Sequence, residues 1–295
     1  MEKQFWKKQD NRIWIKVASF ALAAVLLLLC VWPSPKKLQY DVVLMGDSVI
    51  GNKVAHKSIA VHEYIAEQTG LTVFNGAFGG SGMAKQTGES GAVCNSSWCM
   101  ANLAQAICLD TWEGAKASMA YADHYKDTNR QAFSGYKERM EALSQIDFEN
   151  VRVLIIEHGT NDYNSGVPID NEEDPFDIGT FGGALRSALT LLQKHYPDLR
   201  IVLVTPAYCE VGTEEKYSSD TKDWGGGLLA KYVEKELEIA AQYGVEVIDA
   251  YHQSGLNADN VYDYTTDGLH PNADGIVLLG DLISNYLKGN VNEDK

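Results

Sequence analysis

Five short apolar runs recur along the chain from residue 42 onward, and each stops at a polar or glycine-containing segment. The runs are continuously apolar and rich in β-branched residues, which is typical of strands buried on both faces of a parallel sheet. Segments with helical periodicity lie between most of them. The alternation therefore predicts an α/β fold in which helices cover both faces of one parallel sheet. The predicted strands are residues 42–45, 71–74, 151–156, 201–204 and 245–248.

Apolar residues at helical spacing predict the connecting helices. These helices cover residues 52–69, 181–195, 228–243 and 273–287. Residues 84–150 are less regular and are expected to form a mainly helical excursion, with helices at 101–119 and 136–143. The excursion would be either a wall over the site or a structural cap. Its Trp98 and Trp112 are expected to pack in the core or cap, in preference to serving as platforms for sugar rings.

An unbroken run of apolar and small residues, VASFALAAVLLLLCVW, occupies residues 17–32. As a helix it would be roughly 24 Å long, a little short of a ~30 Å hydrocarbon core. Lys16 can snorkel, so that the preceding turn completes the span. A cleaved signal peptide is the alternative, but no Ala-x-Ala-like site follows the run. The predicted organisation is a cytoplasmic segment 1–16, a transmembrane anchor 17–33, a linker 34–38, a globular domain 39–289 and a polar tail 290–295.

Charge is distributed unevenly between the N-terminal segment and the rest of the chain. Residues 1–37 carry seven basic and two acidic side chains, and because the whole chain is at −15, the remainder is at −20. So acidic a body repels nucleic acid, and no nucleic-acid partner is expected. Five basic residues precede the apolar span and two follow it, which places the N-terminus in the cytoplasm and the body outside. The membrane is thus the predicted partner of the N-terminal helix, and the sequence leaves the oligomeric state open.

The body contains Cys94, Cys99, Cys108 and Cys209. Four cysteines permit three pairings, and an oxidising exterior favours disulfides. Cys94 and Cys99, in a turn-like segment, are the favoured pair. A zinc site is the rival interpretation, but no Cys-x-x-Cys motif or spaced histidine pair completes four ligands. We therefore expect neither a metal nor an organic cofactor.

Candidate chemistry lies at the ends of the predicted strands, the edge at which parallel sheets bind ligands. Ser48 follows the first strand, a glycine-rich loop containing Gly80 follows the second, and Asn161 follows the third. Asp267 and His270, three residues apart, precede the last helix, so a tight turn can bring the carboxylate against the imidazole. Acyl transfer by serine needs a base, a group that orients the base, and donors for the developing oxyanion. The set supplies each part, although each residue taken alone could belong to an ordinary turn.

Two polar residues near this set, His158 and Asp162, are expected to have structural roles. His158 lies beside the third strand end and is expected to be a structural histidine. Asp162 is expected to shape its loop and not to take part in the chemistry.

Four blocks carry a family resemblance: Gly46-Asp47-Ser48, Asn75 with Gly80, Gly159-Thr160-Asn161-Asp162, and Asp267-x-x-His270. In kind and order they resemble the blocks of the SGNH (GDSL) hydrolases, over about residues 40–287. The resemblance implies a flavodoxin-like three-layer α/β/α sandwich with a sheet of about five strands. It also implies a serine esterase.

The resemblance assigns roles by position. Ser48 would be the nucleophile, His270 the base and Asp267 the residue that orients the base. The oxyanion hole would consist of the Ser48 N–H, the Gly80 N–H and the Asn161 side-chain amide. Because the second block is dense in glycine, Gly82 is the alternative to Gly80.

Together these observations predict an extracytoplasmic, membrane-anchored serine esterase that forms an acyl-enzyme. The linker is short, and a first strand rising from the membrane would point its catalytic end outward. That direction favours O-acyl esters, especially O-acetyl esters, on cell-wall or other glycans. The alternatives are an O-acyltransferase with the same triad, a lipase- or lysophospholipase-like esterase, and a non-catalytic glycan-binding ectodomain.

Overall fold

The computed structural model describes residues 37–51, 59–86, 96–126, 135–212 and 214–291. The chain divides into two units, Met1–Lys37 and Leu38–Lys295, and the second contains nearly all of the described residues. The predicted anchor at 17–33 lies outside the described residues. None of the helices within the described ranges has the length and apolar character needed to cross a membrane.

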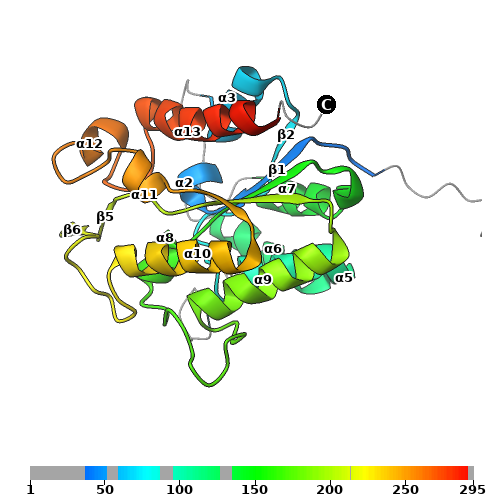
Figure 1. Cartoon of the computed structure of the whole chain (residues 1–295), viewed down its shortest axis with the longest axis horizontal. Helices are drawn as coiled ribbons and strands as arrows, with labels where there is room; N and C mark the ends of the chain where they lie inside the picture. Colours follow the sequence, from blue (N-terminus) through cyan, green and yellow to red (C-terminus); the bar gives the residue numbers. More distant parts are fainter. Residues whose placement is uncertain (1–36, 52–58, 87–95, 127–134, 213, 292–295) are drawn as a thin grey trace, which may run out of the picture. The chain divides into compact units, whose positions relative to one another are not determined.

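The second unit is built on a five-stranded, fully parallel sheet (Figure 1). Its strands are β1 (Val42–Gly46), β2 (Val73–Asn75), β3 (Val153–Glu157), β4 (Arg200–Val204) and β7 (Glu246–Ile248). They lie in the order β2-β1-β3-β4-β7. This is the order of flavodoxin-like doubly wound sheets, in which the strand order reverses between β1 and β3. The prediction of a parallel sheet of about five strands is confirmed.

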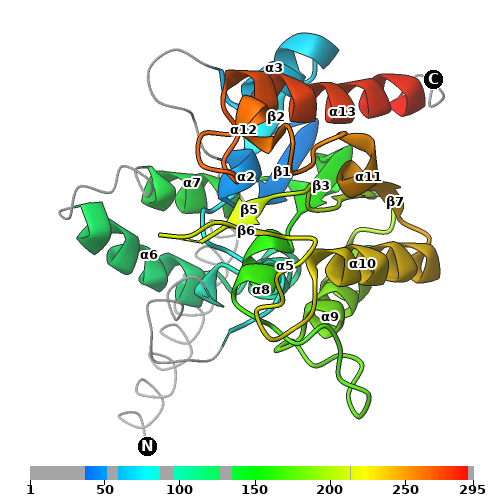
Figure 2. The ribbon, with the colours of Figure 1, turned by 90° about the vertical axis from the view of Figure 1, so that its left-hand side faces the viewer.

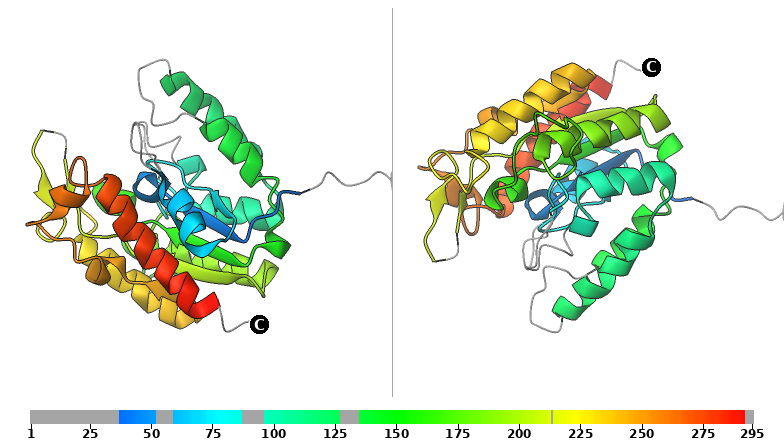
Figure 3. Two further views of the ribbon diagram at one scale, coloured as in Figure 1. Left: turned by 90° about the horizontal axis from the view of Figure 1, so that it is seen from above. Right: turned by 90° about the horizontal axis from the view of Figure 1, so that it is seen from below.

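Both faces of the sheet are buried because alternate residues of each strand point to opposite sides. On one face, Val42 and Leu44 belong to a core cluster with residues of α3 (Val61–Thr69) and α13 (Ala273–Val291). On the other face, Val43 and Met45 pack with α5 (Met100–Leu109), α7 (Tyr136–Leu143), α9 (Phe181–His195) and α10 (Leu229–Tyr243). The result is three layers, with α3 and α13 on the side opposite α5, α9 and α10 (Figures 1 and 3).

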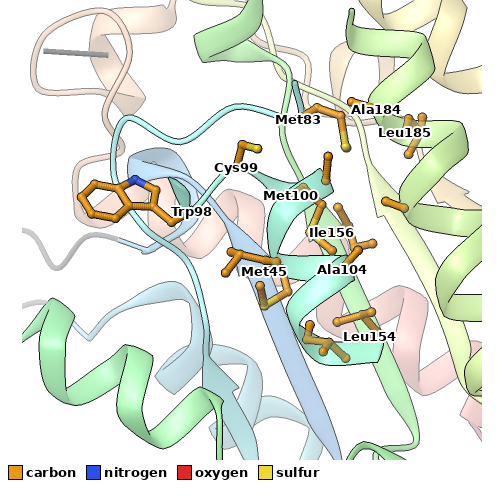
Figure 4. Close-up of a cluster of buried hydrophobic side chains, with 14 of the residues drawn as sticks. Met45, Met83, Trp98, Cys99, Met100, Ala104, Leu154, Ile156, Ala184 and Leu185 are labelled. Atoms are coloured by element: carbon orange, nitrogen blue, oxygen red, sulfur yellow. The ribbon is translucent and has the colours of Figure 1, made fainter. Parts of the chain in front are cut away.

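The larger core cluster contains the beginning of the excursion. Met45 of β1 and Leu154 and Ile156 of β3 lie against Met100 and Ala104 of α5 (Figure 4). Trp98 is fully buried and Trp112 is 7 % exposed, so both tryptophans pack in the core as predicted. Excursion residues are therefore part of the main core.

The structure corrects the sequence prediction in the excursion and at the loops. The single helix expected at 101–119 is wrong, because α5 ends at Leu109 and Asp110 adopts a left-handed conformation with φ of 54° before α6 (Glu113–Lys126) begins. Short elements that lack a clear periodicity were also not predicted. These are α2 (Ser48–Gly51), a 3₁₀ turn (Phe148–Asn150), α8 (Thr160–Asn164), β5 (Glu210–Val211), β6 (Tyr217–Ser218), α11 (Ala250–Gln253) and α12 (Val261–Tyr264).

Cys99, Cys108 and Cys209 are free thiols. The expected Cys94–Cys99 disulfide is therefore not present, and Cys94 itself lies outside the described residues. Cys99 is buried within the larger core cluster, where burial raises the pKa of its thiol to about 12. Cys99 therefore serves as a small apolar residue of the core in this structure.

Two acidic side chains are buried beneath the carboxyl edge of the sheet. Glu157 ends β3 and Glu236 lies on α10, and each has at least one carboxyl oxygen without a hydrogen-bond partner among the described residues. Burial raises the pKa of both carboxyl groups well above the usual range, so the protonated form is favoured in the folded protein.

We expect Glu236→Gln to stabilise the protein more at about pH 8 than at about pH 5. In the wild-type protein the unfolded chain ionises Glu236 near pH ~4.3, while the folded chain keeps the proton. Stability is therefore lost as the pH rises toward the raised pKa of the folded state, by about 1.4 kcal/mol per pH unit. Glutamine cannot ionise and removes this loss. Urea unfolding at the two pH values measures the difference.

The matched control is Glu234→Gln on the same helix, where the carboxylate is exposed and pairs with Lys231 at 2.7 Å. Its effect on the free energy of unfolding should be small and nearly the same at both pH values. An equal gain from Glu236→Gln at both pH values would contradict the prediction.

Candidate functional site

The predicted site residues come together at the carboxyl edge of the sheet, where α2 and α8 follow β1 and β3 (Figure 2). Ser48 begins α2, directly beyond β1, and Asn161 lies in α8, directly beyond β3. Since the strand order reverses between β1 and β3, this is the position at which doubly wound sheets leave a crevice for ligands. Asp267 and His270 lie in the loop before α13 and reach the same place.

Ser48, His270 and Asp267 form a hydrogen-bonded series. The Ser48 Oγ lies 3.0 Å from His270 Nε2, and His270 Nδ1 lies 2.8 Å from Asp267 Oδ2. In a productive tautomer Nδ1–H donates to the carboxylate and Nε2 accepts from the serine hydroxyl. The geometry is that of a nucleophile, a base and a group that orients the base.

The loop that carries His270 is held by its own side chains. Asp267 Oδ1 accepts the backbone N–H groups of Leu269 and His270, at 3.1 and 2.8 Å. Gly268 has φ of +89°, and a Cβ there would lie 2.8 Å from the Glu210 carbonyl oxygen, so the turn requires glycine. Glu210 N–H in turn donates to the Gly268 carbonyl at 2.8 Å, so the β5–β6 hairpin supports the loop.

The same contacts set the charges of the pair. Burial works against ionisation of Asp267, but hydrogen bonds from the His270 ring and backbone lower the pKa of its carboxyl group overall. The hydrogen bond from Asp267 raises the pKa of the His270 imidazole, although burial opposes it. Asp267 is therefore a carboxylate at neutral pH and stabilises an imidazolium when His270 takes a proton.

The loop after β2 presents a backbone donor at Gly80. The Ser81 N–H donates to the Phe78 carbonyl at 3.1 Å, and Gly80 has φ of +75°, the conformation of the third residue of a type II turn. Among the described residues, neither the Gly80 N–H nor the Ser48 N–H has a hydrogen-bond acceptor. Gly82, the alternative, lies against the Asp162 carboxylate, where a Cβ would be 2.8 Å from Oδ2. The Gly82 N–H also has no acceptor among the described residues, so Gly80 is favoured only because the Asp162 carboxylate disfavours an anion beside Gly82.

The side-chain amide of Asn161 is engaged within the protein. Its Nδ2 donates to Asp47 Oδ2 at 2.7 Å and to the Ser81 carbonyl at 3.0 Å, which accounts for both amide hydrogens. Asn161 thus joins the turn before Ser48 to the loop that carries Gly80. As a third oxyanion donor it would have to share one of these hydrogens.

Asp162 and His158 behave as structural residues. Asp162 is fully buried and accepts the N–H groups of Met83 and Ala84, at 2.7 and 2.9 Å, which fixes the end of the glycine-rich loop. His158 is 1 % exposed, and burial lowers the pKa of its imidazole to about 3. No hydrogen bond links His158 to Ser48 or Asp267 in the described structure.

Asp47 is a residue that the sequence interpretation missed. It is fully buried, it accepts the Val49 N–H at 2.7 Å as well as the Asn161 amide, and burial raises the pKa of its carboxyl group to about 7. Its place directly before a short helix is a capping signal that could have identified it. The hydrogen bond that Asn161 donates to the second carboxylate oxygen of Asp47 could not be predicted from the sequence.

We expect Asp267→Asn to lower the pKa of the His270 imidazole, because the neutral amide no longer stabilises the imidazolium. An NMR titration of the imidazole ¹H–¹⁵N signals in the full-length chain measures the value. Asp249→Asn is the matched control, since Asp249 Oδ2 lies 2.8 Å from His252 Nδ1 in an equivalent pair three residues apart. The control should leave the pKa of His270 unchanged, and an unchanged value in Asp267→Asn would refute the prediction.

Comparison with known proteins adds an independent line of evidence. Residues 77–276 match the model of the GDSL-like lipase/acylhydrolase family. This range contains Gly80, Asn161, Asp267 and His270, while Ser48 precedes it. No curated protein sequence matched the chain.

Solved structures show the same fold. A protein from Lactobacillus plantarum is 18 % identical with a TM-score of 0.56, over 86 % of this chain and 99 % of that one. A "possible lipase" from Chitinophaga pinensis is 17 % identical with a TM-score of 0.52, over 85 % and 98 %. At these identities the similarity concerns the fold alone. Because the family model covers about two thirds of the residues, the chain belongs to the GDSL-like lipase/acylhydrolase family and is an ester-hydrolysing serine hydrolase.

Proposed function

We propose that Ser48 is the nucleophile of this hydrolase, with His270 as its base and Asp267 as the residue that orients the base. The observation that carries the proposal is the continuous series from Ser48 Oγ through His270 to Asp267, at 3.0 and 2.8 Å. Ser48 Oγ attacks the ester carbonyl carbon while His270 Nε2 takes the hydroxyl proton. The imidazolium then protonates the leaving alkoxide, and an acyl-enzyme remains on Ser48. A water molecule then gives a proton to His270 Nε2 and attacks the acyl carbonyl carbon, and the imidazolium returns that proton to Ser48 Oγ as the carboxylic acid leaves.

The negative charge of the tetrahedral intermediate needs donors at the same edge. The N–H groups of Ser48 and Gly80 have no acceptor within the part of the chain that the structure describes, and they are suited to this role because a preorganised donor costs no reorganisation during the reaction. The amide of Asn161 contributes either by sharing a hydrogen with the oxyanion or by holding the Gly80 loop against Asp47.

Ser48→Ala and His270→Ala should each lower turnover of an activated ester by roughly 10⁴- to 10⁶-fold, because each removes a member of one cooperating unit. Steady-state hydrolysis by the full-length chain measures the loss. Ser187→Ala and His252→Ala are matched controls on α9 and α11 and should retain turnover. Activity retained by Ser48→Ala would overturn the assignment of the nucleophile.

The substrate is proposed to carry a short acyl group, in the simplest case acetyl. A small apolar cavity of about 20 Å³ lies beside the site, and its lining includes Val49, Leu269 and Leu278. Val49 and Leu269 are chain neighbours of Ser48 and His270, although neither Ser48 nor His270 itself lines the cavity. Its volume is little more than the space that one water occupies, which suits a methyl group better than a long alkyl chain.

The carrier of the acyl group is proposed to be a glycan outside the cell. This proposal rests on the predicted anchor at 17–33 and on the excess of basic residues before it, which places the N-terminus in the cytoplasm. A catalytic domain with a net charge near −20 would remain outside, where cell-wall glycans are accessible.

A panel of esters tests the acyl group and the carrier together. With the full-length chain, kcat/KM should be highest for acetyl esters and fall by about tenfold or more toward octanoyl esters, on sugars as well as on simple alcohols. Ser48→Ala is the background control. Preference for long-chain lipid esters would contradict the short-acyl proposal. Transfer of acetyl to an added glycan in place of release of acetate would make the enzyme a transferase.

A further inference from the structure

A helix of the excursion holds the loop that presents Gly80. Tyr136, in the first turn of α7, accepts a hydrogen bond from the Gly79 N–H at 2.6 Å through its hydroxyl oxygen. Arg139, one turn further along α7, donates from Nη1 to the Ala77 carbonyl oxygen. Two side chains of one helix thus bind consecutive parts of the loop directly before Gly80.

Ring contacts fix the position of both side chains. The Tyr136 ring lies edge-on to Phe78, with centroids 5.4 Å apart, and edge-on to Trp98 at 6.2 Å. The Arg139 guanidinium lies 5.2 Å from the Tyr136 ring centroid and 5.9 Å from that of Phe78. Tyr136 is only 2 % exposed. Its hydroxyl is therefore held by packing and does not have to be ordered when it binds the loop.

Of the N–H groups of residues 77–80, only that of Gly80 has no acceptor among the described residues, and further along the loop the Gly82 N–H has none either. The Ala77 N–H is bound by Asn75 Oδ1 at 3.1 Å, and the Phe78 N–H by the Gly46 carbonyl at 2.9 Å. The next N–H, of Gly79, is bound by Tyr136. The following one, of Gly80, has no acceptor among the described residues.

The direction of the Gly80 N–H depends on these neighbours. It belongs to the central peptide of the Phe78–Ser81 turn, and that peptide points in opposite directions in type I and type II turns. Glycine at both central positions makes either turn accessible. The hydrogen bond from the Gly79 N–H to Tyr136 fixes the peptide group directly before the central one. The hydrogen bond from Asn161 to the Ser81 carbonyl fixes the peptide group that follows Ser81.

We propose that Tyr136 and Arg139 are positioning residues for the oxyanion hole, which hold the 77–79 backbone so that the Gly80 N–H faces the reacting carbonyl. The inference rests on the proposed function, in which Gly80 is an oxyanion donor. It gives the excursion a role in catalysis, because α7 then supports the donor loop from outside the sheet. Neither side chain touches the substrate in this arrangement.

Tyr136→Phe removes the hydroxyl acceptor and keeps the ring contacts with Phe78 and Trp98. The full-length variant should lose roughly 10- to 100-fold in kcat with little change in KM, somewhat less than the ~10²- to 10³-fold loss of an oxyanion donor itself. Affinity for a trifluoromethyl ketone, whose tetrahedral adduct carries an oxyanion, should fall by the same factor. Arg139→Met should act in the same direction.

Tyr196→Phe is the matched control. Tyr196 donates from its hydroxyl to the Ile107 carbonyl at 3.0 Å and so binds another helix of the excursion, α5, by one tyrosine hydroxyl. This variant should keep the wild-type kcat and inhibitor affinity. A loss of kcat and inhibitor affinity of the same size in both variants would mean that Tyr136 only stabilises the fold, and it would overturn the proposal.

A readout that needs no activity separates this inference from the proposed function. In the resting full-length chain, the Gly80 amide should exchange with solvent deuterium at a changed rate, or show a shifted ¹⁵N signal, in Tyr136→Phe and not in Tyr196→Phe. If the wild-type chain hydrolyses no ester, the proposed function fails while this readout still decides the positioning. An unchanged Gly80 amide together with an unchanged kcat would refute the positioning role.

Discussion

The parallel pairing of β1 with β3 is the constraint on which the site depends. In their register Gly46 lies opposite Glu157, so both strands end at the same level and the residues that follow them meet at one edge. A slip by one residue would exchange Val42 and Leu44 with Val43 and Met45 between the two core faces. The packing of α3 and α13 on one side, and of α5 and α9 on the other, therefore fixes the register. The same packing brings Ser48 and Asn161 together.

Around this edge the protein buries more polar groups than stability alone would favour. Asp47 and Asp162 are fully buried, yet each accepts two hydrogen bonds that hold backbone or side chains of the site. Satisfied networks of this kind fix a local geometry in the protein interior. Glu236 instead lacks partners among the described residues and destabilises the fold when it ionises. Strain and buried polar groups that lower stability are common near functional groups, where the geometry of the site matters more than stability.

Much of this fold could be predicted from the sequence, because buried parallel strands and amphipathic helices leave strong periodic signals. The sheet and the helix at 181–195 are where the pattern placed them. The split of α5 from α6 at Asp110 could not be predicted, since a non-glycine residue in a left-handed conformation carries no clear signal. Ser48, Asp267 and His270 could be paired because short spacings and strand ends restrict where they lie. The contacts of Asp47 with Asn161 and of Tyr136 with Gly79 join segments far apart in the chain, and no local pattern reports them.

The family match and the structure describe different parts of one arrangement. The match begins at residue 77 and thus covers the glycine-rich loop and the His270 loop, but not the strand end that bears Ser48. The structure supplies that link, since the Phe78 N–H and the Ser81 Oγ both donate to the Gly46 carbonyl and so join the glycine-rich loop to the turn before Ser48. The glycine-rich loop is then bound by three separate segments: by β1, by Asn161 after β3 and by α7 of the excursion. A loop of several glycines has many accessible conformations, and contacts from three separate segments restrict it to one. On this view the excursion contributes to the order of the glycine-rich loop through Tyr136 and Arg139 of α7.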